Sequence, residues 1–254
     1  MINNLWFNIY DNYNYNELIF LTFYVLLISE LPIIFFTLLD ILQLSCLKKY
    51  RIKYKDYPNR VYPTIDELYE AGIEFSKILF LYLIPVTLIG LKFIDIIKWR
   101  PYTISRKLPT LGSFTLQYIF CSVCGDLLFY LFHRVVHHPK IYFIHRHHHV
   151  YKYNSFSLVN HVLHPIEVIM FIIPPALPPI LIKSHISVMW TYAIITNWIG
   201  IYIHSGYQFS LLEKIIMVKS KDHDIHHVKP KKNFSTGLFY SLTDRVFGTY
   251  SNLE

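Results

Sequence analysis

The sequence predicts an all-α, multi-pass membrane protein with a cytosolic cap lined by histidines. Hydrophobic residues make up 53% of the chain and charged residues only 16%, and about four to five apolar segments separate its polar stretches. All 14 histidines lie between His133 and His227. A soluble domain carries more charge than this, and the alternation of a β-barrel is absent.

The first apolar segment covers residues 18–39 and carries one charge, Glu30. Its 22 residues are enough to span a bilayer. The loop that follows, residues 48–60, holds six basic residues, and positively charged loops stay in the cytoplasm. Residues 1–17 are therefore expected across the membrane, and they show no removable signal peptide.

The later apolar segments bring the histidines to one side of the membrane. Residues 78–91 are uncharged for only 14 positions, so this segment either spans or re-enters. Residues 108–125 then lead into the first histidines, and 168–182 and 186–203 form two further runs, of which prolines interrupt the first. Two passes return the chain to the same face, where the histidine clusters can meet.

Three histidine clusters have the spacing of metal ligands on helices, since residues three and four apart share one face. The first is an HxxxH pair and the other two are HxxHH boxes. Their members are His133 and His137; His145, His148 and His149; and His223, His226 and His227.

Neutral imidazole binds zinc, iron, copper or nickel, so the ligand type leaves the metal open. Eight clustered histidines exceed the four ligands of one tetrahedral zinc ion and therefore predict two metals. Zinc does not change its redox state, whereas a pair of irons can activate dioxygen. A histidine-rich pair at a membrane surface therefore favours oxidation of a lipid.

Other functions fit the sequence less well. A metal transporter places its ligands near the bilayer midplane, whereas these clusters lie between apolar runs. No HExxH motif of a zinc hydrolase occurs, and the intact boxes argue against a catalytically dead binding protein. The net charge of +7 resides in loops between apolar runs, which membrane topology explains without nucleic-acid binding.

In this order, HRVVHH, HRHHH and HDIHH resemble the boxes of the fatty acid hydroxylase superfamily of membrane non-haem di-iron enzymes. Further stretches resemble its methylsterol monooxygenases: RPYTISRKLP at 100–109, HPIE at 164–167, HSGYQFS at 204–210 and NFSTGLFYSLTDRVFGTY ending at Tyr250. Cholesterol 25-hydroxylases share the boxes and an HSGY segment, so that alternative stays open. Residues 1–112 are expected to form membrane segments and a basic loop, and residues 113–254 the hydroxylase-like domain.

The resemblance implies metal ligation by the eight box histidines, and His164 and His204 match two further family histidines. It also implies two irons per chain, O2 as co-substrate, and hydroxylation of the C-4 methyl group of a 4-methylsterol. A cholesterol 25-hydroxylase, or a fatty acid or sphingolipid hydroxylase, is the alternative. No GxGxxG nucleotide motif is present, so electrons are expected from outside the chain. The resemblance implies that they come from NAD(P)H through a reductase and a b-type cytochrome, and that the chain resides in the endoplasmic reticulum membrane.

The remaining polar residues near the boxes are expected to play supporting roles. His138, His147, His161 and His185 have no place in the boxes and are interpreted as surface or ligand-orienting histidines. Asp126 and Asp224 could accept a hydrogen bond from a ligating imidazole. Five lysines near the last box could attract an acidic redox partner or lipid headgroups; they are Lys219, Lys221, Lys229, Lys231 and Lys232.

Overall fold

The computed structural model describes residues 6–7, 11, 15–53, 62–99 and 101–252. Over these residues it holds helices and two isolated β-bridges but no strand, which confirms the all-α fold class. Predictions about the polar start of the chain, most of the basic loop and Arg100 fall outside the described residues.

Four helices are long and apolar enough to cross a membrane: Leu18–Leu42, Ile65–Ile96, Leu111–Val136 and Ile186–His204. The first consists of α2 (Tyr15–Ser29) and α3 (Leu31–Leu42), which meet at Glu30. The second consists of α4 (Ile65–Lys77), a π-helical segment η2 (Ile78–Leu83) and α5 (Ile84–Ile96). The third is α6 (Leu111–Val136) and the fourth is α9 (Ile186–His204).

The second spanning helix is longer than its apolar segment predicts. It begins at Ile65, 13 residues before residue 78, because Thr64 and Glu67 form a capping box there. The Glu67 N–H donates to Thr64 Oγ1 at 3.1 Å, and the Thr64 N–H donates to Glu67 Oε2 at 2.7 Å. With 32 residues the helix is long enough to span, which favours a crossing over a re-entrant loop.

Prolines do not break the helix that follows the second histidine box, contrary to the sequence prediction. Helix α8 (Pro165–Leu181) continues through Pro174, Pro175, Pro178 and Pro179. Each proline removes a backbone donor, but neighbouring helices can satisfy the freed carbonyls in a membrane bundle. Here α8 packs along α6 and against α9.

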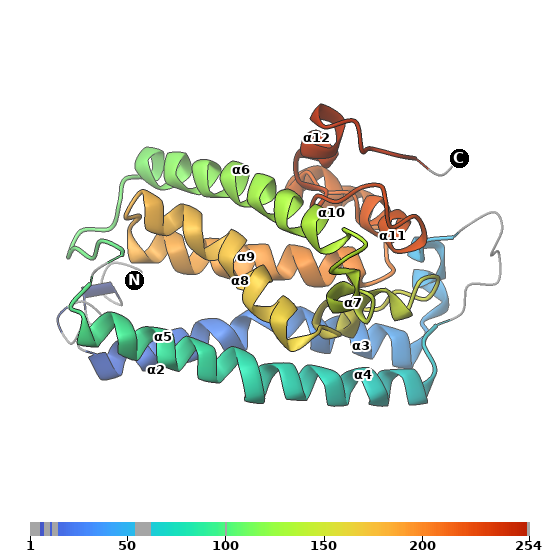
Figure 1. Ribbon diagram of the computed structural model, residues 1–254, viewed down its shortest axis with the longest axis horizontal. Helices are drawn as coiled ribbons and strands as arrows, with labels where there is room; N and C mark the ends of the chain where they lie inside the picture. The colour runs from blue at the N-terminus through green and yellow to red at the C-terminus, as the bar shows by residue number, and fades with distance from the viewer. Residues whose placement is uncertain (1–5, 8–10, 12–14, 54–61, 100, 253–254) are drawn as a thin grey trace.

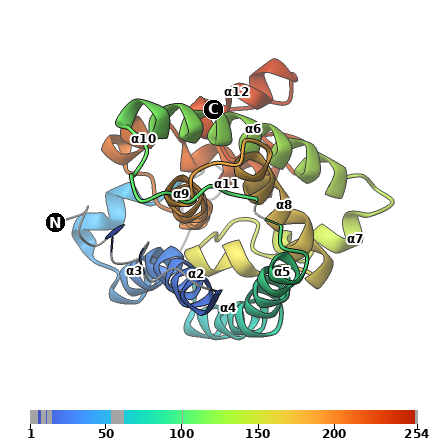
Figure 2. The same ribbon diagram turned by 90° about the vertical axis from the view of Figure 1, so that its left-hand side faces the viewer.

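Helix α9 lies in the middle of the bundle and contacts α2, α3, α6, α8 and α11 (Figure 2). A buried apolar cluster fills the space between α3, α9 and the 3-10 segment η4 (Ser157–His161), with Phe36, Phe156 and Ile201 among its members. The N-terminal membrane segments and the histidine-bearing half of the chain therefore share one core.

One end of the bundle carries a cap of short helices, seen on the right of Figure 1. These are η1 (Ser45–Tyr50), α7 (Tyr142–His145), η3 (His148–Val150), α10 (Ser210–Ile216), α11 (Ser220–Val228) and α12 (Leu238–Val246). Helices α6 and α9 both end at this cap, with His133 in the last turn of α6 and His204 as the last residue of α9. The ends of these two spanning helices thus bring their histidines to the cap.

Candidate metal centre

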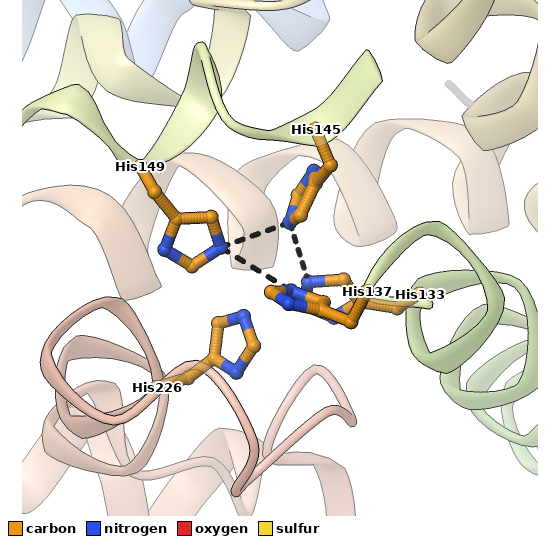
Figure 3. A group of neighbouring side chains, drawn as sticks. All are labelled: His133, His137, His145, His149 and His226. Atoms are coloured by element: carbon orange, nitrogen blue, oxygen red, sulfur yellow. Dashed lines mark hydrogen bonds between the residues drawn. The ribbon is translucent and has the colours of Figure 1, made fainter. Parts of the chain in front are cut away.

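Five histidines from four segments form one group whose ligand nitrogens lie within 4.8 Å of one another. As Figure 3 shows, their rings point toward a common centre. They are His133 and His137 at the end of α6, His145 on α7, His149 on η3 and His226 on α11. Four of the five are buried, and His137 is half-buried.

A second group of four buried histidines meets the same distance criterion. His148 comes from η3, His204 from α9, and His223 and His227 from α11. The rings of the two groups also touch, because the centroids of His149 and His227 are 4.7 Å apart. The nine histidines therefore make two adjacent sites.

The ring nitrogen Nδ1 of five of these histidines faces an oxygen acceptor. Because a carbonyl or carboxylate oxygen only accepts, Nδ1 carries the proton and Nε2 keeps its lone pair. The acceptors are the carbonyls of Phe234 for His133 (2.7 Å), Val162 for His148 (3.3 Å), Gly200 for His204 (2.7 Å) and Lys232 for His226 (2.7 Å), and Glu167 Oε1 for His145.

Burial favours the neutral form of the clustered histidines. It lowers the pKa of His145, His148 and His149 well below the usual range, and neighbouring histidines lower it further. Burial and then His133 lower the pKa of His137 to about 2. Neutral imidazole is the form that binds a metal.

Lone pairs of neighbouring rings therefore face each other at close range. The Nε2 atoms of His133 and His145 are 3.0 Å apart, and so are those of His148 and His204. Neither nitrogen of either pair has a proton to share, so these contacts are not ordinary hydrogen bonds. A cation between the rings would turn the repulsion into coordination.

The donor set fits two metal ions. The closest Nε2 atoms within each group lie 3.0 to 3.3 Å apart. Two nitrogens that bind one ion at about 2.1 Å lie at such a separation. Within the described residues, Nε2 of His226 and both ring nitrogens of His227 are buried without a hydrogen-bond partner, which is costly. A metal ion would satisfy Nε2 of His226 and one ring nitrogen of His227.

The family model described as "Fatty acid hydroxylase" matches residues 118–249, just over half of the chain. The chain belongs to the fatty acid hydroxylase family. The match begins within α6 and ends after α12, so it contains all nine clustered histidines.

Relatives within or near this family differ in their named substrates. The chain is 30% identical over 159 residues to cholesterol 25-hydroxylase-like protein 2 of Danio rerio (59% of this chain, 56% of the relative). It is 28% identical over 249 residues to a fatty acid hydroxylase of Mycosarcoma maydis (96% and 60%). It is 29% identical over 133 residues to methylsterol monooxygenase 1 of Rattus norvegicus (51% and 44%).

The chain spans roughly half the length of these relatives. Among solved structures none matches it. The family match places the chain among the fatty acid hydroxylases, and the relatives leave its substrate undecided.

Nine of the ten histidines that the sequence predicts as ligands lie in the two groups, including His204. His164 does not. It begins helix α8, where its Nδ1 accepts a hydrogen bond from the Ile166 N–H at 3.2 Å. The signal that selected His164, its place in HPIE, reflects a helix cap in this structure.

Asp126 does not orient an imidazole, contrary to the expectation. Its carboxylate accepts hydrogen bonds from the Thr236 N–H (3.2 Å) and the hydroxyls of Thr236 (2.6 Å) and Thr243 (2.5 Å). These hydrogen bonds connect α6 to the segment before α12 and to α12 itself. Asp224 is fully buried on α11.

The four histidines that were not predicted as ligands divide into two pairs. His138 and His147 are exposed, as a surface role predicts. His161 and His185 are buried: His161 Nε2 lies 3.4 Å from Glu30 Oε1, and His185 caps the start of α9. Glu30, the partner of His161, comes from a distant part of the chain, which spacing alone does not reveal. The partner of His185 is local, because its Nδ1 accepts from the Ser187 N–H at 3.2 Å.

Sequence reasoning missed the oxygen atoms that orient the ligands. Glu167 is fully buried; its Oε1 accepts from His145 Nδ1 and its Oε2 from the His164 N–H at 3.2 Å. HPIE contained a signal for this carboxylate, because a glutamate three residues after a helix start is typical of a capping box. The backbone carbonyls had no such signal.

Proposed function

We propose that this chain is a membrane di-iron monooxygenase that hydroxylates a sterol. The proposal rests on two adjacent groups of five and four histidines. Within each group the ligand nitrogens lie within 4.8 Å of one another. Family membership supports a hydroxylase, and the relatives named after sterols support the substrate class.

The two groups would each hold one iron, and O2 would be the oxidant. When bound, the irons would supply the electron transfer that activates dioxygen for insertion into a C–H bond. One oxygen atom enters that bond and the other leaves as water, which consumes two electrons and two protons. Nine neutral histidines in two groups exceed the four ligands of one tetrahedral zinc ion, which agrees with a pair of metals.

The protein's own groups position the ligands and keep water out. Glu167 and the carbonyls of Phe234, Val162, Gly200 and Lys232 hold the proton on Nδ1, so that Nε2 faces the centre. The rings of Phe129 and Phe171 contact His133 from the membrane side, with centroid distances of 5.2 and 5.9 Å. These apolar rings shield the ligands from solvent.

Electrons would arrive from NAD(P)H through a reductase and a b-type cytochrome, because this reaction needs an external reductant. We place the chain in the endoplasmic reticulum membrane with the histidine cap on the cytosolic side, where such partners would dock. Which sterol carbon is oxidised depends on the substrate cavity. Hydroxylation of the C-4 methyl group, which the sequence predicts, stays a prediction.

The experiment begins with protein purified anaerobically in detergent and loaded with ferrous iron. We expect about two irons per chain, and a single turnover with O2 and a mixture of sterols should yield a product with one added oxygen by mass spectrometry. His148→Ala and His226→Ala should abolish turnover, each from a different group.

His138→Ala and His147→Ala are matched controls, because both side chains are exposed and lie outside the two groups. They should retain iron and turnover. A protein that binds no metal pair, or turnover that survives loss of His148 and of His226, would refute the proposal.

A further inference from the structure

The segment between α11 and α12, residues 232–235, supplies two of the carbonyls that orient clustered histidines. The Lys232 carbonyl accepts from His226 Nδ1 and the Phe234 carbonyl accepts from His133 Nδ1, both at 2.7 Å. Both histidines belong to the five-histidine group (Figure 3). The placement of this segment therefore decides how two candidate ligand rings are held.

A buried carboxylate on α12 binds the N–H groups of the same segment. Asp244 Oδ2 accepts from the Ser235 N–H at 2.9 Å, and Asp244 Oδ1 accepts from the Phe234 N–H at 2.8 Å. Oδ1 also accepts from the Thr249 hydroxyl at 2.7 Å. Asp244 and Ser235 are buried, so these charge-assisted hydrogen bonds are strong.

The Ser235 N–H and the Phe234 carbonyl belong to one peptide group. In a planar trans peptide the N–H and the C=O point in opposite directions. A carboxylate at the N–H end polarises the group, so the carbonyl oxygen at the other end becomes a better acceptor. Asp244 therefore strengthens the hydrogen bond from His133 Nδ1 without a contact to the ring.

We propose that Asp244 is a positioning residue for the metal centre, which acts on His133 through the peptide group between Phe234 and Ser235. The inference rests on the proposed function, because it takes His133 as a metal ligand. A carboxylate that accepts directly from Nδ1 fixes the ring and raises the basicity of Nε2. Asp244 has the same effect with one peptide group between the carboxylate and the imidazole.

The two histidine groups differ in this respect. Glu167 and Asp244 supply carboxylates to the five-histidine group, one directly and one through a peptide group. The Nδ1 acceptors found for the four-histidine group are backbone carbonyls, those of Val162 and Gly200. Loss of the Asp244 carboxylate should therefore weaken the ion in the five-histidine group and spare the other ion.

Asp126 provides a matched control, because this buried carboxylate binds the next N–H along the chain, that of Thr236, at 3.2 Å. The carbonyl in the same peptide group is that of Ser235. It is not among the acceptors found for the nine clustered histidines, all of which the structure describes. Asp126→Asn thus loosens the chain beside residues 232–235 without altering a peptide group that contacts a candidate ligand.

The test titrates the whole metal-free chain in detergent with Co²⁺, read by its visible absorption, in competition with a graded chelator series. Wild-type protein should bind two ions. Asp244→Asn turns an NH2 group toward one N–H of the segment and should weaken one ion about tenfold, the low end of the range for a lost orienting partner. The second ion should bind as in wild type. Asp126→Asn should bind both ions with wild-type affinity.

Equal losses in Asp244→Asn and Asp126→Asn would overturn the inference, because anchoring of the segment would then explain both. Unchanged affinity in Asp244→Asn, or loss of both ions, would also overturn it. Wild-type protein that binds fewer than two ions would instead refute the proposed function.

Circular dichroism of the metal-free protein checks that Asp244→Asn folds. If it does not fold, an amide-to-ester replacement at Ser235 removes the N–H that Asp244 binds and should cause the same tenfold loss. The same replacement at Thr236 is its control and should leave both ions unaffected. Wild-type affinity in the Ser235 ester, or an equal loss in the Thr236 ester, would overturn the inference.

Discussion

At the scale of single residues, Glu167 connects helix structure to metal chemistry. One oxygen caps the start of α8 and the other accepts from His145 Nδ1. A carboxylate that holds the proton on Nδ1 makes Nε2 a stronger metal ligand. The same side chain therefore fixes the helix start and the orientation of a ligand ring.

Replacement of Glu167 by glutamine should lower iron affinity about 10- to 100-fold, as is typical when an orienting partner of a metal ligand is lost. Iron content after dialysis against a graded chelator series measures this. Glu67→Gln is the matched control, because Glu67 forms an equivalent capping box on α4 and contacts no clustered histidine. Equal iron loss in both variants would mean that capping, and not the bond to His145, matters.

Residue spacing in the sequence identified the clustered histidines better than it identified their surroundings. The HxxxH and HxxHH spacings select His133, His137 and the two boxes because helical neighbours share a face, and these residues do meet. His164 has no such neighbour, and only its resemblance to a family position suggested a ligand. Contacts such as His161 with Glu30 join residues more than 130 positions apart, and no local pattern reports them.

At the scale of elements, the lengths of the apolar segments predicted which helices could span the membrane. The starts of helices α4 and α8 were instead set by side chains that cap them. The apolar segment at residues 78–91 gave no sign of α4, whose sequence is amphipathic and begins at the Thr64 cap. Prolines suggested a broken segment where α8 is continuous. Propensity describes an isolated chain, and packing of α8 against α6 and α9 outweighs it here.

The turn after α9 is an element that the N-terminal half of the chain holds in place. Gly206 has φ of +74°, and a Cβ atom there would lie 2.4 Å from the Ser155 carbonyl oxygen and 2.9 Å from an Arg51 guanidinium nitrogen. Arg51 is buried, pairs with Asp40 at 3.0 Å and donates to the Ser205 carbonyl at 3.2 Å. This packing fixes the backbone two residues after His204.

Gly206→Ala should therefore destabilise the protein by more than the roughly 1 to 2 kcal/mol of left-handed strain alone, because two contacts must also move apart. Thermal unfolding in detergent measures the change. Gly112→Ala on α6 is the control, since a Cβ there meets nothing within 4 Å. A melting temperature equal to that of Gly112→Ala would contradict this account of the turn.

At the scale of the whole molecule, neutral buried histidines make the metal-free fold sensitive to acid. The pKa of His137, His223, His226 and His227 lies below the ordinary value of 6.5, first because of burial. The unfolded chain therefore binds more protons than the folded chain as the pH falls below 6.5. Each such histidine removes up to about 1.4 kcal/mol of stability per pH unit in that window.

Metal-free protein should consequently lose stability steeply between pH 6.5 and 5, while its stability at pH 7 to 8 should be nearly constant. Thermal unfolding across this range measures the effect. Iron-loaded protein should begin its loss at lower pH, because protons must compete with the metal for the same nitrogens. A flat profile for the metal-free form would mean that these histidines are not neutral and buried.

The cap also presents charge to a partner on the same side as the metal centre. Lys229 and Lys231 are exposed, and the carbonyl of their neighbour Lys232 accepts from the ligand candidate His226 at 2.7 Å. Charge near a docking surface chiefly accelerates encounter. An acidic redox partner that docked on these lysines would lie beside the ligand candidate His226.

The double variant Lys229→Glu and Lys231→Glu should slow reduction by the cytochrome about tenfold or more at low ionic strength, and the difference should shrink as salt screens the charges. Stopped-flow spectroscopy of cytochrome oxidation measures the rate. Reduction by a small neutral reductant should be unchanged, which separates docking from damage to the site. Lys107→Glu, an exposed lysine just before α6 at the other end of the bundle, is the control. If it slowed the cytochrome equally, net charge and not this surface would govern the encounter.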